Sequence, residues 1–117
     1  MIDKKEIKKS YKLTMTPMGV YQIKNLVNRK IFVGSSKNIS GRINRHKFQL
    51  QFGGEEIKEL MDDYRKFGAE NFSFETLDQL KPKDEPGYDY SEDLEVLREL
   101  WMEKLQPFGE RGYNKKD

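Results

Sequence analysis

The chain of 117 residues has room for one modest domain, because two independent cores would each be too small to be stable. Hydrophobic residues make up 35% and charged residues 36% of the chain, the net charge is +2, and there is no cysteine. The composition excludes disulfides and thiolate metal sites, no apolar run approaches membrane-spanning length, and we expect a cytoplasmic protein.

The first regular structure predicted is a β-hairpin, after a polar, lysine-rich arm over residues 1–17. "GVYQIK" and "KIFVG" are both rich in β-branched and aromatic residues, which is typical of strands. The intervening "NLVNR" holds Asn25 and Asn28, which tolerate turn geometry, and it places Arg29 where a glycine would relieve a positive φ. We therefore expect one domain over residues 18–117 that begins with this hairpin.

Two helices are predicted next. Asn38 is suited to cap the first, and Ile39, Ile43 and Leu50 have the spacing of one helical face. The second is expected to begin at about Glu55, where acids favour the positive end of the helix dipole. Its buried residues should be Ile57, Leu60 and Met61, and Gly68 should end it after Phe67.

A third strand and a last helix complete the pattern. "NFSFETL", residues 71–77, alternates Phe72, Phe74 and Thr76 with polar residues, which predicts a strand with one buried face. "KPKDEPGYDY" has the composition of a surface loop. The final amphipathic helix, closed by Pro107, should bury Leu94, Leu97, Leu100, Trp101, Met102 and Leu105.

Charge divides the chain into two parts. Residues 13–54 contain no acid, whereas acids outnumber bases from Glu55 to Glu103. The basic part is able to attract a polyanion such as nucleic acid, although charge asymmetry alone fits an ordinary solvated face equally well. Its bases are Lys24, Arg29, Lys30, Lys37, Arg42, Arg45 and Lys47.

Several motifs occur in a fixed order. "GVY" and "FVG" stand on the two strands of the hairpin, and the following helix carries Arg42 and His46 four residues apart, hence on one face. "ENFSFE", Trp101 and a terminal Gly112-Tyr113-Asn114 follow. Together these motifs, over about residues 18–114, resemble the GIY-YIG nuclease family.

The resemblance implies a fold and an activity. The fold would be α/β (α+β), with a small three-stranded antiparallel sheet flanked by helices. The activity would be hydrolysis of DNA phosphodiester bonds by a divalent-metal-dependent endonuclease with a single Mg²⁺ or Mn²⁺ ion. Such an enzyme acts on DNA, does not enter membranes, and here would take its sequence specificity from a loop, the arm or a protein partner.

The resemblance also implies roles for residues. Tyr21 would line the active site and orient or deprotonate the attacking water, Arg42 would neutralise charge on the phosphoryl group, and His46 would act near the same phosphate. These roles suit phosphodiester cleavage, which needs charge stabilisation and a nucleophilic water. Contacts to nucleic acid are expected from Lys37, Arg45, Lys47 and Asn114.

Two departures from the family pattern are visible. Phe32 replaces the second hairpin tyrosine, and Arg98 occupies the position of the family's catalytic glutamate. A cation there would repel a metal ion. Glu99, with Glu95 as the fallback, is the substitute metal ligand that we predict, although both are also ordinary surface acids of a helix. The alternative function is a catalytically impaired homologue that binds nucleic acid or a protein without cutting.

Overall fold

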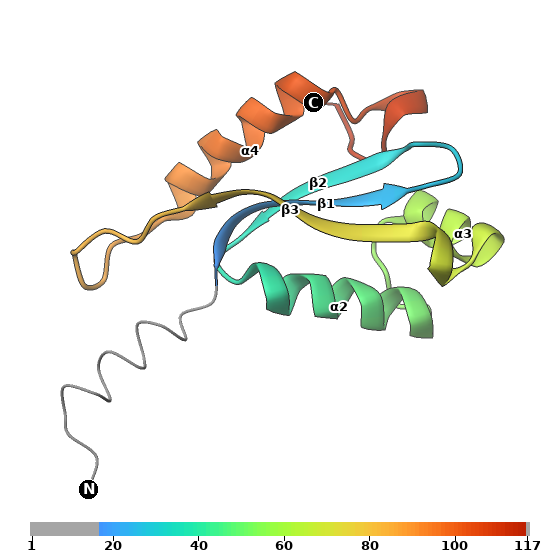
Figure 1. The fold of residues 1–117 in the computed structure, drawn as a ribbon, viewed down its shortest axis with the longest axis horizontal. Coiled ribbons are helices and arrows are strands. Elements are labelled where there is room, and N and C mark those ends of the chain that lie inside the picture. Colours follow the sequence, from blue (N-terminus) through green and yellow to red (C-terminus); the bar gives the residue numbers. More distant parts are fainter. Residues whose placement is uncertain (1–16, 117) are drawn as a thin grey trace, which may run out of the picture.

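The computed structural model describes residues 17–116, so the predicted arm lies outside the described residues except for Pro17. It contains one antiparallel sheet of three strands in the order β2-β1-β3, formed by β1 (Met18–Asn25), β2 (Ile31–Ser36) and β3 (Phe72–Leu80). Helices α2 (Ile39–Phe52) and α3 (Lys58–Phe67) lie on one side of the sheet and α4 (Ser91–Leu105) on the other (Figure 1). The predicted three-stranded sheet flanked by helices is confirmed.

The β1–β2 hairpin has the predicted turn. Asn25 Oδ1 accepts a hydrogen bond from the Val27 amide, and Asn28 Oδ1 accepts one from the Lys30 amide. These are local side-chain contacts that favour turns. Arg29 adopts φ 70°, so the expected positive φ at this residue is confirmed.

A bulge distorts the pairing of β1 with β3. Tyr21 lies opposite Thr76 and Val20 opposite Asp78, with the register shift between Val20 and Tyr21. At Gly19, φ is 155° and a Cβ would stand 2.0 Å from the Asp78 carbonyl oxygen, so the close approach of the two strands requires glycine. The prediction that Thr76 is buried is wrong: Thr76 precedes the bulge and shares the face of Phe72 and Phe74, but it is exposed on the edge strand β3.

The helices on the first side of the sheet follow the sequence signals closely. Asn38 caps α2 by accepting a hydrogen bond from the Gly41 amide, and Gly68 ends α3, both as predicted. The expected start of α3 near Glu55 is wrong, since the helix begins at Lys58 after an extended Ile57. Glu55 belongs instead to the connection between α2 and α3, where its side chain has another partner.

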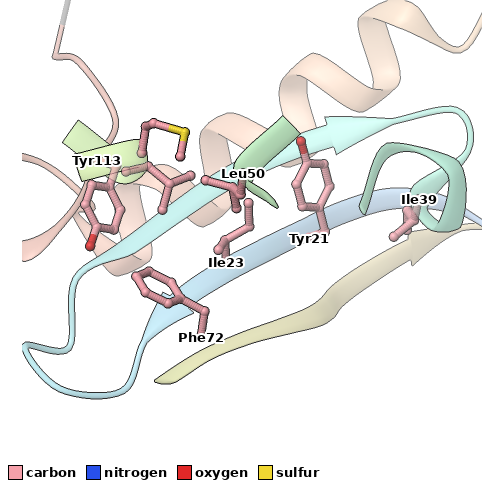
Figure 2. Packing of buried hydrophobic residues seen from close by; sticks show 8 residues of the cluster. Tyr21, Ile23, Ile39, Leu50, Phe72 and Tyr113 are labelled. Carbon is pink, nitrogen blue, oxygen red and sulfur yellow. The ribbon is translucent and has the colours of Figure 1, made fainter. Parts of the chain in front are cut away.

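The core has two parts, one on each side of the sheet. The larger part contains Tyr21 and Ile23 of β1, which leave the strand on the same face, together with Ile39, Leu50, Leu60, Met61, Phe72 and Tyr113 (Figure 2). The smaller part contains Val20, Ile31 and Val33, against which Leu97, Trp101, Met102 and Leu105 of α4 pack. Leu100 was expected in this second part, but it is 58% exposed because it lies on the outer face of α4.

The C-terminal "GYN" segment is tied to the hairpin. The Tyr113 hydroxyl donates a hydrogen bond to Asp63 Oδ2 of α3 at 2.7 Å and accepts one from Asn25 Nδ2 at 3.1 Å. It therefore joins the end of the chain to both the hairpin and α3. In the described part of the chain, no helix has both the length and the apolar character needed to span a membrane.

The hairpin turn yields a first prediction. Arg29→Gly should raise the free energy of unfolding by about 0.5–1 kcal/mol, because glycine adopts the left-handed conformation without the steric cost that a Cβ brings. Urea denaturation followed by circular dichroism would measure the change. Arg29→Ala is the matched control and should give no gain, since alanine keeps the Cβ. Equal stabilisation by both variants would attribute the effect to the arginine side chain rather than to the backbone.

Candidate active site

Tyr21 and His46 meet at the centre of the predicted site. Tyr21 is supplied by β1 and His46 by α2, and the phenol oxygen lies 2.9 Å from His46 Nε2. Both residues are buried, with exposed fractions of 1% and 3%. The sequence placed these two side chains in one site, and the fold brings them into direct contact.

The glycine of "FVG" is what allows the Tyr21 ring to lie as it does. Gly34 on β2 is paired with Tyr21, and a Cβ on Gly34 would stand 2.5 Å from the Tyr21 hydroxyl oxygen. Any larger residue would occupy the space of the ring. The hairpin glycine therefore sets the direction in which the phenol points, toward α2.

The second ring nitrogen of His46 is also engaged. His46 Nδ1 lies 2.8 Å from Glu55 Oε2, and the two side chains are only 4% and 3% exposed. Both ring nitrogens thus have partners within the protein. No sequence motif marks Glu55 as a site residue, and its one signal in the sequence is its position nine residues after the single histidine of the chain.

Arg42 is one of several charged residues that affect the pKa of the Tyr21 phenol. Burial raises the pKa of the Tyr21 phenol above its usual value, while a hydrogen bond from Arg42 and the charge of that guanidinium oppose the rise. The charge of Glu55 adds to the increase in the Tyr21 pKa, and the charge of Arg98 on α4 lowers it. The phenol is therefore protonated at neutral pH in this arrangement.

A cleft of about 320 Å³ opens beside these residues. Tyr21 does not line it, so the expected open position of the phenol differs from the structure, in which the ring belongs to the core. Arg42, by contrast, is exposed and lines the cleft. The cleft is lined by Phe32, Arg42, Arg45, His46, Gln49, Glu55, Glu56 and Ile57.

Phe32, the departure in the second tripeptide, packs inside this group. Its ring centroid is 6.3 Å from that of Tyr21 and 5.7 Å from that of His46. It supplies an apolar wall to the cleft and no hydroxyl. The hydrogen-bonding groups of the cleft are therefore those of Arg42, Arg45, His46, Gln49, Glu55 and Glu56, with the Tyr21 hydroxyl in contact with His46.

The predicted metal ligands lie on α4. Glu95 Oε1 is 2.8 Å from Arg98 Nη2, so this carboxylate is in an ion pair, and Glu99 is exposed. Residues 17–116 contain no cluster of three or more acid, histidine or cysteine side chains that could hold a metal ion. The cation of Arg98, which is paired with Glu95 and lies next to Glu99 in the sequence, would repel a divalent ion, so the donor set on α4 does not fit the single ion that the family resemblance implied.

The predicted nucleic-acid contacts are spread around the site. Arg45 lines the cleft, Lys47 Nζ lies 5.0 Å from the centre of the Phe74 ring, and Lys37 Nζ is 3.4 Å from Asp89. Asn114 Oδ1 accepts from the Val33 amide and Asn114 Nδ2 donates to the Val33 carbonyl, each at 2.9 Å. This amide pairs with the edge of β2 in the manner of a neighbouring strand.

Known proteins share the family and the fold of this chain. A family model described as the GIY-YIG catalytic domain matches residues 17–94, which include Tyr21, Arg42, His46 and Glu55 but not Arg98. Intron-associated endonuclease 1 of Enterobacteria phage T4 is 33% identical over 88 residues, which are 74% of this chain and 32% of that protein. The chain thus spans about a third of that relative's length.

Two solved structures share the fold. The catalytic domain of homing endonuclease I-TevI has a TM-score of 0.70 and 27% identity, covering 86% of this chain and 99% of that chain. A glutamate-to-alanine mutant of the catalytic domain of intron endonuclease I-TevI has a TM-score of 0.69 and 29% identity, covering 85% and 93%. The architecture therefore matches over most of both chains.

The packing at Gly34 yields a second prediction. Gly34→Ala should lower the free energy of unfolding by about 1–3 kcal/mol, because the new methyl group meets a buried ring that His46 and Phe32 enclose. Urea denaturation followed by far-UV circular dichroism would measure the loss. Gly54→Ala is the control, since its Cβ would meet the Gln49 side chain at an ordinary 3.8 Å. Equal effects at both positions would contradict the role given to Gly34.

Proposed function

The chain belongs to the GIY-YIG nuclease family, and on this premise we propose that it is a DNA endonuclease domain whose active site is formed by Tyr21, Arg42 and His46. The observation that carries the proposal is the phenol oxygen of Tyr21, which lies 2.9 Å from His46 Nε2 and whose pKa, raised by burial, is lowered in part by the nearby Arg42 guanidinium. A base and a cation thus meet at one oxygen atom.

Phosphodiester hydrolysis needs these two kinds of group. A base must take a proton from the attacking water, and fixed positive charge must stabilise the phosphoryl oxygens in the transition state. Arg42 is exposed beside the cleft, so its guanidinium is accessible to a phosphate. We propose that Arg42 gives up its hydrogen bond to Tyr21 when it binds the phosphate, which uncovers the phenol for the attacking water.

Positive charge in this site comes from arginines. The charge of Arg98 acts on Tyr21 from α4, on the side of the site opposite the α2 residues, and Glu95 is held by Arg98. We therefore propose that Arg98, together with Arg42, supplies the charge stabilisation that the expected divalent ion would otherwise provide. No step of the proposed reaction passes through a metal ion.

DNA is the substrate that the relatives and the charge pattern favour. The phage relative is named as an intron-associated endonuclease, and residues 13–54 of this chain contain bases but no acid. We propose that Lys37, Arg45 and Lys47 contact backbone phosphates and that Asn114 holds β2 in place beside them. A protein partner that supplies sequence specificity remains part of the proposal.

Nicking of supercoiled plasmid tests the function. The wild-type chain should nick in Mg²⁺ and equally in EDTA, and Tyr21→Phe and Arg42→Ala should each slow nicking by on the order of 10²-fold or more. Arg111→Ala, which changes an exposed arginine of the short helix η2 (Gly109–Arg111), should retain the wild-type rate.

Other outcomes are equally informative. Nicking that survives both active-site variants would identify a contaminant or a different site. A wild-type chain that does not nick, yet shifts DNA in a gel with an affinity that falls steeply with salt, would support the binding-only alternative. Nicking abolished by EDTA would contradict the role given to Arg98.

Replacing Arg98 tests the charge argument directly. Arg98→Glu places a carboxylate on this face of α4 and frees Glu95 from its ion pair, so cleavage should become dependent on Mg²⁺ or Mn²⁺ and be lost in EDTA. Titration calorimetry with Mn²⁺ should show binding to this variant. Arg98→Gln is the control, which removes the cation without adding a ligand and should bind no Mn²⁺. If Arg98→Glu neither binds Mn²⁺ nor responds to it, Arg98 does not occupy the position assigned to it.

A further inference from the structure

Glu55 is a buried acid that the sequence predicted to be an ordinary helix-start residue. Its side chain is 3% exposed, and its carboxylate lies 2.8 Å from His46 Nδ1. An ionised carboxylate removed from water is costly unless it is paired and hydrogen-bonded. Its position in the connection before α3 therefore reflects its contact with His46 and not the helix dipole.

One arrangement of the hydrogens around His46 gives the Tyr21 proton a partner. The Arg42 guanidinium, which acts on the phenol, can only donate hydrogen bonds and so cannot accept this proton. His46 Nε2, 2.9 Å from the phenol oxygen, can accept it when Nε2 carries no hydrogen. In a neutral imidazole the hydrogen is then on Nδ1, where it is donated to Glu55.

We propose that Glu55 is a positioning residue that fixes the Nδ1–H tautomer of His46, so that Nε2 accepts the phenol proton of Tyr21. This inference rests on the proposed nuclease function and extends it, because it makes His46 the group that activates Tyr21. In this arrangement His46 acts on Tyr21 and not on the phosphate, because its two ring nitrogens contact Tyr21 and Glu55.

The proton transfers balance as follows. The O–H bond of Tyr21 breaks and an N–H bond forms at His46 Nε2, giving a phenolate and an imidazolium that the Glu55 carboxylate stabilises. The phenolate takes a proton from the attacking water, whose oxygen forms a bond to phosphorus while the bond from phosphorus to the leaving sugar oxygen breaks. The leaving oxygen takes up a proton from solvent in the cleft, and His46, which lines the cleft, releases its extra proton to solvent, so that the neutral imidazole is restored beside the re-formed phenol.

The buried environment of the Tyr21 phenol explains why its proton would be transferred to His46. Burial raises the pKa of the Tyr21 phenol, so the phenol does not ionise by itself near neutral pH. The charged groups that face it are Arg42 from α2, Glu55 from the α2–α3 connection and Arg98 from α4. Arg45 and Glu56 line the cleft next to His46 and Glu55. A base in contact with the phenol removes the proton that burial would otherwise retain.

The chain has one histidine, so its tautomer can be observed without ambiguity. Long-range ¹H–¹⁵N correlation NMR of protein labelled at histidine should show a protonated Nδ1 and an unprotonated Nε2 in the wild type. Glu55→Ala should lose this pattern, Glu55→Gln should keep it because its amide oxygen can still accept from Nδ1–H, Glu55→Asp should show it at least in part, and Tyr21→Phe should keep it. Asp62→Asn, at an exposed acid of α3, is the control and should leave the spectrum unchanged.

The catalytic part of the proposal is tested by nicking kinetics on the same variants. Glu55→Gln should lower the turnover rate by on the order of 10²-fold while DNA affinity, measured by gel shift, stays within about twofold of wild type. A structural role alone would alter both measurements or neither. Glu55→Asp should recover part of the lost rate.

The two measurements separate the possible failures. A wild-type spectrum with protonated Nε2, or one that Glu55→Ala does not change, overturns the tautomer assignment whether or not the chain cuts DNA. The expected spectra with an unchanged rate in Glu55→Gln overturn the relay and leave the nuclease proposal intact. A wild-type chain that never nicks overturns the proposed function and the catalytic use of the relay, while the spectra still decide whether Glu55 orients His46.

Discussion

The position of the Tyr21 ring over the backbone of Gly34 is the constraint on which the rest of the site depends. The ring can lie across β2 only because Gly34 has no side chain, and it then directs its hydroxyl toward α2. His46 and Arg42 are four residues apart on that helix, so both reach the same oxygen atom. Both glycines of the hairpin motif are needed for steric reasons. The missing side chain of Gly19 allows β3 to approach β1, and that of Gly34 leaves room for the Tyr21 phenol.

Burying this polar group has an energetic consequence. Tyr21, His46 and Glu55 are removed from water, and such a network stabilises a fold only when its members satisfy one another. No buried side-chain nitrogen or oxygen of residues 17–116 lacks a hydrogen-bond partner. The hydrogen bonds that compensate for desolvation are the same ones that orient the phenol proton. Stability and the proposed chemistry therefore depend on one set of contacts.

Much of the fold could be predicted because its signals are local. The cap at Asn38, the positive φ at Arg29 and the end of α3 at Gly68 each follow from the properties of one residue and its neighbours. Tyr21, Arg42 and His46 could be grouped because their strand and helix positions recur in a recognisable order. Periodicity failed to predict exposure where tertiary packing decides it, as at Thr76, which keeps the face of Phe74 but is exposed on an edge strand.

Glu55 illustrates what a sequence alone cannot provide. Acids near a helix start are common and usually exposed, so nothing local distinguishes Glu55 from Glu56. The difference arises because α3 begins only at Lys58, which leaves Glu55 in a connection that turns back against His46. That turn depends on how α2 and α3 pack on the sheet, through Leu50, Leu60 and Met61.

The charged residues that act on Tyr21 come from both sides of the sheet. The α2 side provides a cation at the surface and a carboxylate beneath, while α4 contributes Arg98. A phosphodiester in the cleft would meet the exposed Arg42 and Arg45, but Glu55 and Glu56 line the same cleft. The pairing of Glu55 with His46 therefore matters, because an unpaired carboxylate would repel the phosphate, whereas one held on an imidazole stabilises the proton that the imidazole gains. This pairing is thus what allows an acid to assist at a site that must bind an anion.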